Sequence, residues 1–266
     1  EMPRMDGFTF LRFLMARQPT PVIVISSQSQ RENVFKALEL GALDFVARPS
    51  GGPAEFASVR EELLRKVGVV RSLRPIQRPA ALPHVSTASQ PATIVRPMTP
   101  APGSLRSPLT RSQSRQAPKR LVVIASSTGG PQAVVDLVSR LPATSQLGVV
   151  IAQHMPERFT RTFAERLARR SPLRVAEGED GGVVDAGSVW ICPGARATEI
   201  ELDAALVPRL RVFAVDATDR YVPSADRLFK SAAIAYSSRF TAVVLTGMGD
   251  DGALALPFVK RAGGEV

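Results

Sequence analysis

The feature that most limits how this chain can fold is a fifty-residue stretch near its middle, residues 71–120. It contains nine of the chain's 22 prolines, nine of its 34 lysines and arginines, and no aspartate or glutamate. A stretch like this, without helical or strand periodicity, cannot bury enough apolar surface to offset the entropy lost when its backbone is ordered. We therefore predict a disordered basic linker over 71–120, between two folded segments at 1–70 and 121–266.

The linker also accounts for the basic character of the chain. The formal net charge is +10, and the nine basic residues of the linker supply all but one unit of it. Clustered lysines and arginines attract nucleic-acid phosphates, but no motif that enters a nucleic-acid groove accompanies them here. We therefore expect no nucleic-acid partner.

Hydropathy and cysteine content indicate the compartment. No apolar run approaches the roughly 20 residues that cross a bilayer, and the first residues lack the basic and apolar regions of a signal peptide. The single cysteine, Cys192, cannot form an internal disulfide and fits a reducing environment. We expect a cytoplasmic protein without membrane insertion.

Both outer segments alternate short apolar runs with amphipathic helical patterns, which is typical of βαβ units around a parallel sheet. In the first segment the pattern predicts a strand at 22–25, a helix at 31–40 and a strand that begins at Phe45. In the second it predicts strands at 121–125, 148–152, 189–192, 211–215 and 241–245, and helices at 132–141, 160–169 and 225–236. We predict an α/β fold with a doubly wound, mainly parallel sheet for the second segment.

Three of these strands end in residues that can carry chemistry. Ser127 follows the first strand in a glycine-rich turn before a helix, His154 follows the second, and Asp250 and Asp251 follow the last. The carboxyl ends of parallel strands line the crevice where open α/β folds bind ligands. A hydroxyl, an imidazole and a carboxylate on one scaffold are the parts of a hydrolase triad.

Each of these residues also has an ordinary structural explanation. The serine turn is compatible with a helix N-cap or with a phosphate cradle, although it lacks the lysine of a P-loop. The histidine alone is compatible with a structural hydrogen-bonding role, and the two acids with a helix N-terminus. One usable histidine is too few for a typical metal site, and the other, His84, lies in the linker, so we expect no metal.

The segment from Leu121 onward resembles the catalytic domain of the chemotaxis-specific protein-glutamate methylesterases, the CheB family. The matching stretches are "SSTGGPQAV", "AQHMPERFTRTFAERL", "PSADRLFKSAA" and "LTGMGDDGA". Together they cover nearly all of 121–264. Ala125 departs from the glycine that the family commonly has there. The family domain continues beyond the last residues, "KRAGGEV", so we expect 121–266 to be incomplete at its C-terminal end.

This resemblance implies an ester hydrolase that needs no cofactor. Its catalytic residues would be Ser127, His154 and Asp251, with Thr128 and Met248 lining the site. Its substrates would be the glutamate γ-methyl esters of methyl-accepting chemotaxis receptors, with deamidation of glutamines as a second activity. The alternative is a catalytically silent regulatory or nucleotide-binding module built on the same sheet.

The first segment resembles the second half of a response-regulator receiver domain, which has a flavodoxin-like fold. The match lies in "EMPRMDGFTFL", "TPVIVISS" and "ALELGALDFVARP". The resemblance implies that Ser26 is the switch hydroxyl and Phe45 the switch aromatic, and it puts Arg48 where receivers have lysine. It also implies a chemotaxis histidine kinase as partner of the full-length receiver. The phosphoryl-accepting aspartate would precede the first residue, so we expect no acceptor within this chain.

Overall fold

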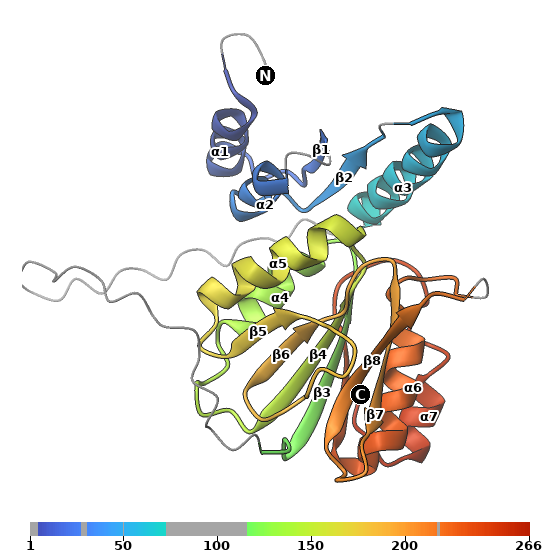
Figure 1. Ribbon diagram of the computed structural model, residues 1–266. Helices are drawn as coiled ribbons and strands as arrows, with labels where there is room; N and C mark the ends of the chain where they lie inside the picture. Colours follow the sequence, from blue (N-terminus) through green and yellow to red (C-terminus); the bar gives the residue numbers. More distant parts are fainter. Residues whose placement is uncertain (1–4, 28–30, 50, 73–115, 217–218) are drawn as a thin grey trace, which may run out of the picture. The chain divides into compact units, whose positions relative to one another are not determined.

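The computed structural model describes residues 5–27, 31–49, 51–72, 116–216 and 219–266 (Figure 1). Most of the predicted linker, residues 73–115 with His84, lies outside the described residues. No helix in the described ranges is long and apolar enough to cross a membrane.

The first segment consists of three helices and a two-stranded parallel sheet. Helix α1 begins after Asp6, whose carboxylate accepts the backbone N–H groups of Phe8 and Thr9 and so satisfies two otherwise unpaired donors. Strands β1 and β2 run parallel, with Ile23 opposite Asp44 and Ser27 opposite Arg48. The elements are α1 (Gly7–Arg17), β1 (Ile23–Ser27), α2 (Arg31–Glu39), β2 (Asp44–Arg48) and α3 (Pro53–Ser72). The sequence pattern predicts β1, α2 and β2 but not α1 or α3.

The second segment is built on a five-stranded sheet in the order β5-β6-β4-β3-β9, in which every described pair is parallel. Its strands are β3 (Arg120–Ser126), β4 (Leu147–Gln153), β5 (Arg174–Glu177), β6 (Ser188–Ile191) and β9 (Phe240–Val244). Its helices are α4 (Gly130–Val138), α5 (Glu157–Arg170), α6 (Ala225–Tyr236), the short 3-10 helix η2 (Ser237–Arg239) and α7 (Leu256–Arg261).

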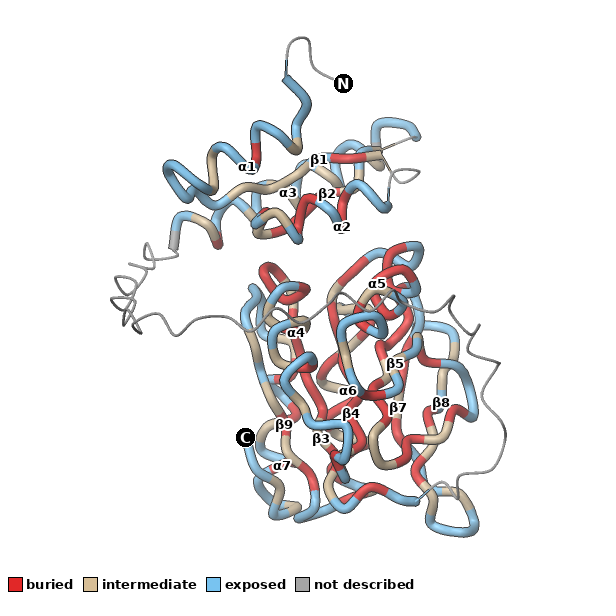
Figure 2. The backbone as a smooth tube through the Cα atoms, turned by 90° about the vertical axis from the view of Figure 1, so that its left-hand side faces the viewer, coloured by how far each residue is buried: buried red, intermediate tan, exposed pale blue. Residues whose placement is uncertain are grey.

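Apolar clusters cover both faces of this sheet. Successive residues of β3 point to opposite faces, so Ile124 belongs to the cluster under α4 and α5, whereas Val123 and Ala125 belong to the cluster under α6 and α7. Figure 2 shows the buried residues concentrated along the central strands, and all but the first residue of β4 are buried. The structure therefore has helices on both faces of a parallel sheet, which confirms the predicted fold class.

One predicted strand lies elsewhere. The strand expected at 211–215 is part of β8 (Pro208–Ala214), which pairs antiparallel with β7 (Arg196–Leu202) in a separate two-stranded sheet. Only five residues join the two strands, and a parallel crossover needs a dozen or more. Asp203 holds this turn by accepting the backbone N–H groups of Ala205 and Val207.

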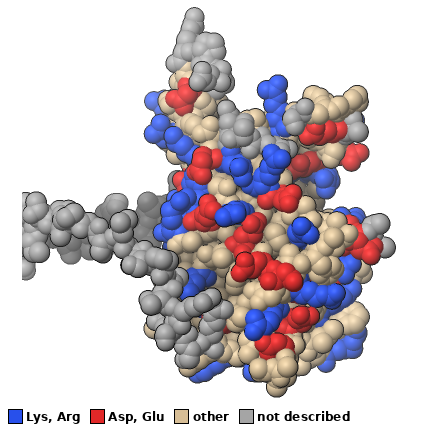
Figure 3. Space-filling view, in the orientation of Figure 1, with Lys and Arg blue, Asp and Glu red and all other residues tan. Residues whose placement is uncertain are grey.

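Charged side chains of both signs are interspersed over the face of the molecule in Figure 3. Acidic residues pair with many of the arginines, as Asp185 does with Arg174 and Asp203 with Arg209. The described surface therefore lacks a large single-sign field over this face, in agreement with a charge excess that lies mainly in the linker.

Helix α6 offers a direct test of the packing. Phe229 is fully buried, whereas Ile234 on the same helix is 83% exposed. We expect Phe229→Ala to lower the free energy of unfolding by about 3–5 kcal/mol, because it leaves a cavity beneath the helix. The control Ile234→Ala should change it by less than about 0.5 kcal/mol. Urea unfolding of both variants measures the difference, and equal effects would contradict the assigned faces of α6.

Candidate active site

Ser127 lies in the turn between β3 and α4. Its backbone N–H donates to the carbonyl of Thr246 at 3.0 Å, and its own carbonyl accepts the N–H of Gly130 at 2.8 Å. Gly129 has a φ of +76°, a left-handed conformation that favours glycine. The glycine-rich sequence thus makes the tight turn that places Ser127 at the carboxyl edge of the sheet.

The loop after β9 approaches this turn closely. A Cβ atom added to Gly247 would lie 2.7 Å from the Cβ atom of Ser127. The hydroxyl of Thr246 also donates to the Thr128 carbonyl at 3.0 Å. Glycine at 247 is therefore required by the backbone approach that brings the serine and aspartate loops together.

His154 directly follows β4. Its backbone N–H donates to the Ser126 carbonyl at 2.9 Å, so the histidine and serine loops are joined through the backbone. Its Nε2 atom lies 2.8 Å from Oδ2 of Asp251, and the imidazole is 22% exposed. The other ring nitrogen, Nδ1, thereby remains for a substrate or a serine hydroxyl.

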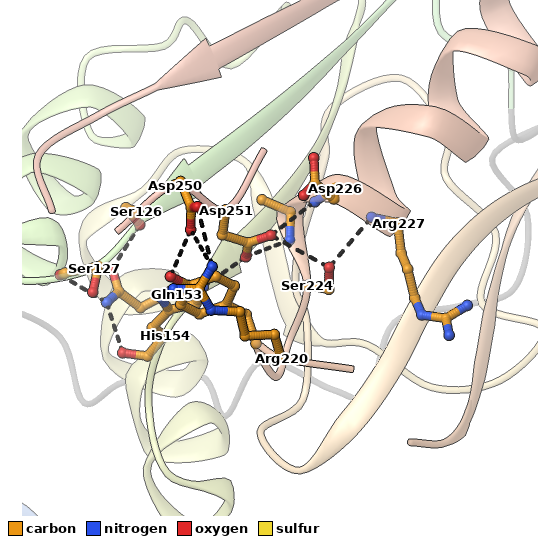
Figure 4. A network of polar contacts seen from close by, with 12 residues as sticks. Ser126, Ser127, Gln153, His154, Arg220, Ser224, Asp226, Arg227, Asp250 and Asp251 are labelled. Atoms are coloured by element: carbon orange, nitrogen blue, oxygen red, sulfur yellow. Dashed lines mark hydrogen bonds and ion pairs between the residues drawn. The ribbon is translucent and has the colours of Figure 1, made fainter. Parts of the chain in front are cut away.

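The Asp251 carboxylate is buried and fully engaged (Figure 4). Besides His154 it accepts hydrogen bonds from the backbone N–H groups of Ala225 and Asp226, at 2.8 and 3.0 Å, and from the Ser224 hydroxyl at 3.3 Å. Burial alone would raise its pKa, but the hydrogen bonds from His154 and the two N–H groups outweigh burial and lower the pKa below the ordinary value. The carboxylate therefore stays ionised beside the imidazole.

The neighbouring Asp250 has other partners. Its carboxylate is exposed and accepts hydrogen bonds from the Tyr221 hydroxyl at 2.8 Å and from Arg220 at 3.1 Å. The hydrogen bond from Tyr221 is the main cause of the lowered pKa of Asp250. The structure thus brings Asp251, and not Asp250, into contact with His154.

Gln153, which the sequence motifs did not single out, links the serine and histidine loops. This fully buried side chain accepts the Ser126 hydroxyl at 2.6 Å and donates to the carbonyls of Ser127 and His154 at 3.0 and 3.1 Å. Among the described contacts, no hydrogen bond joins the Ser127 hydroxyl to His154 directly. In enzymes, the hydrogen bond between a nucleophile and its base is often long without substrate. The sequence did contain a signal for this role, because Gln153 is a polar residue at the end of the apolar strand that precedes His154.

The other expected residues lie in two places. Thr128 is buried beside Ser127, and Met248, which is 37% exposed, lies in the loop after β9. In the first segment Ser26 lies near the end of β1, Phe45 is buried under the Lys66 amine, and Arg48 is exposed at the end of β2. The described residues contain no group of three or more His, Cys, Asp or Glu side chains able to hold a metal ion.

The chain also matches known protein families. The model of the CheB methylesterase family matches residues 122–266. The chain belongs to the CheB methylesterase family. A second model, of the response regulator receiver domain, matches residues 1–58. The CheB-family segment thus contains all three strand-end loops described above.

Individual relatives agree with this assignment. The chain is 48% identical, over 99% of its length and 68% of the relative, to protein-glutamate methylesterase/protein-glutamine glutaminase 6 of Anaeromyxobacter dehalogenans (strain 2CP-C). It is 44% identical to protein-glutamate methylesterase/protein-glutamine glutaminase 3 of Geobacter sulfurreducens, over the full length of this chain and 72% of that relative. The crystal structure of the Thermotoga maritima CheB methylesterase catalytic domain aligns with a TM-score of 0.52 and 37% identity, covering 55% of this chain and 76% of that one.

The two neighbouring acids provide the first test of this site. Asp251→Asn leaves the shape of the side chain intact but replaces the carboxylate that faces His154. We expect kcat on methylated receptor to fall by up to about 10⁴-fold, as for the orienting aspartate of serine proteases. Asp250→Asn should stay within about threefold, because Asn keeps an oxygen that accepts the Tyr221 hydroxyl and exposed ion pairs contribute little. The opposite ranking would move the catalytic acid to Asp250.

Gln153 provides a second test. Gln153→Glu is isosteric but replaces the amide donor by an oxygen that faces two carbonyl oxygens in a buried position. We expect a loss of about 2–3 kcal/mol of unfolding free energy, together with reduced activity. Thermal unfolding and esterase assays of Gln153→Glu, beside the exposed control Gln146→Glu, measure both effects. A fully stable and active Gln153→Glu enzyme would contradict the bridging role.

Proposed function

We propose that this chain hydrolyses glutamate γ-methyl esters on methyl-accepting chemotaxis receptors, with Ser127 as nucleophile, His154 as general base and Asp251 as the orienting acid. Deamidation of receptor glutamines would use the same groups. The observation that carries the proposal is the 2.8 Å contact between His154 Nε2 and a buried, ionised Asp251, beside the loop of Ser127. Membership of the CheB family supplies the substrate class.

The proposed chemistry follows the usual course of acyl transfer. His154 accepts the Ser127 hydroxyl proton as the oxygen attacks the ester carbonyl, and Asp251 stabilises the resulting imidazolium. The tetrahedral oxyanion then collapses, and methanol leaves with the proton from His154. Water hydrolyses the acyl-enzyme by the same proton transfers and regenerates Ser127. With a glutamine substrate the leaving group is ammonia.

The start of α4 is suited to stabilise the oxyanion. The helix begins at Gly130, three residues after Ser127, and its N-cap residue Gly129 offers no side chain to the first turn. Backbone N–H groups and the positive end of the helix dipole at such a position favour a developing negative charge. Thr128 and Met248 would lie beside it.

The receiver match supports a signalling partner. A receiver domain takes its phosphoryl group from a histidine kinase, so we propose a chemotaxis histidine kinase as the partner of the receiver domain.

We also propose a cytoplasmic location, because a lone free cysteine fits a reducing compartment. Cys192 is buried, and burial raises the pKa of its thiol to about 12, so the thiol stays protonated and unreactive.

A serine-directed fluorophosphonate probe tests the nucleophile. We expect the probe to label the chain once, and we expect Ser127→Ala to abolish both labelling and release of methanol from methylated receptor. The control Ser139→Ala, at the exposed end of α4, should leave both unchanged. A folded protein that resists labelling would favour the alternative, a silent α/β module. Circular dichroism establishes that each variant is folded.

A further inference from the structure

The ring of Tyr221 lies parallel to the imidazole of His154. The ring centroids are 5.3 Å apart and the ring planes differ by only 4°, which is the geometry of an offset stacked pair. Tyr221 lies in the segment between β8 and α6. A fourth part of the chain, which none of the catalytic motifs includes, therefore contacts the proposed general base.

Stacking supplies a constraint that Asp251 cannot. The hydrogen bond to Asp251 fixes one atom of the imidazole, Nε2, but leaves the ring free to tilt about that atom. A parallel aromatic face restricts the tilt. The two contacts together define the direction of Nδ1, the atom that would receive the Ser127 proton, and such proton transfer depends steeply on alignment.

Tyr221 is itself held from the loop after β9. Its hydroxyl donates to Oδ1 of Asp250 at 2.8 Å. Arg220 donates to the same carboxylate at 3.1 Å, and its guanidinium carbon lies 5.1 Å from the centre of the Tyr221 ring. A Cβ atom on Gly249, whose φ is +102°, would lie 2.7 Å from the tyrosine oxygen, so the backbone there approaches the hydroxyl as closely as glycine allows.

We propose that Tyr221 is a positioning residue that sets the plane of the His154 imidazole, with contacts from Asp250 and Arg220 holding the tyrosine in place. This rests on the proposed function of His154 as general base. The ring face also favours a cation, so its contact with the imidazole strengthens when His154 takes the serine proton. Asp251 thus contacts the imidazole directly, whereas Asp250 contacts the tyrosine that stacks on it.

Two substitutions separate the ring from the hydroxyl. Tyr221→Leu removes the aromatic face, and we expect kcat to fall about tenfold to a hundredfold with KM unchanged, because only the orientation of the base is lost. Tyr221→Phe keeps the face and loses one hydrogen bond, so kcat should stay within about threefold. Phe258→Leu is the matched control, since Phe258 is also a partly exposed aromatic with an arginine over its ring. It should retain full activity.

The stack can be observed without turnover. The chain has two histidines, and a His84→Gln background identifies the ring-proton resonances of His154 by NMR. Ring current from a parallel tyrosine shifts these resonances, so we expect them to move in Tyr221→Leu and to stay nearly in place in Tyr221→Phe.

Any of four results would overturn the proposal. Three concern kcat: no change in Tyr221→Leu, the same fall in Tyr221→Leu and Tyr221→Phe, or the same fall in Phe258→Leu as in Tyr221→Leu. The fourth is that Tyr221→Leu leaves the His154 resonances in place. A failure of the proposed function is distinguishable, because it would appear as an inactive unsubstituted chain before any change at Tyr221, and the resonances would still decide whether the stacking contact exists.

Discussion

The buried carboxylate of Asp251 is the interaction on which the arrangement of this site depends. Its two oxygens accept hydrogen bonds from the imidazole of His154 and from the N-terminus of α6. A buried carboxylate without such partners would be protonated or would destabilise the fold. The same hydrogen bonds that keep it ionised therefore attach the histidine loop, the β9 loop and α6 to one another.

This arrangement also has a defined dependence on pH. The hydrogen bonds to Asp251 hold its pKa below the ordinary value of 3.8. A carboxyl group with a lowered folded-state pKa stabilises the fold fully above its unfolded pKa, and this contribution is lost as the pH falls through the folded value. Charge on Asp251 is thus present throughout the neutral pH range.

Close approach of the backbone after β9 to neighbouring loops also fixes the positions of the site residues. Gly247 lies against Ser127, and Gly249 lies against the Tyr221 hydroxyl. Gln153 then joins the serine and histidine loops with three hydrogen bonds from a fully buried position. Loops held in this way lose little further entropy when a substrate binds, which is the benefit of a preorganised site. The glycines of the "LTGMGDDGA" stretch are therefore as much a part of the site as its charged residues.

The sequence by itself determined the parallel α/β sheet and the three strand ends that carry Ser127, His154 and the two acids, because apolar periodicity and turn residues are local signals. It did not determine the β7–β8 hairpin, whose strands carry charged residues on their exposed face. The apolar periodicity left open which of the two acids faces His154; the family resemblance named Asp251, and the structure brings that carboxylate to the imidazole. Only the tertiary structure showed that Gln153 bridges two loops and that Tyr221 stacks on the imidazole. These contacts join residues up to 97 positions apart, and such pairings depend on how the loops meet in space, which no local pattern records.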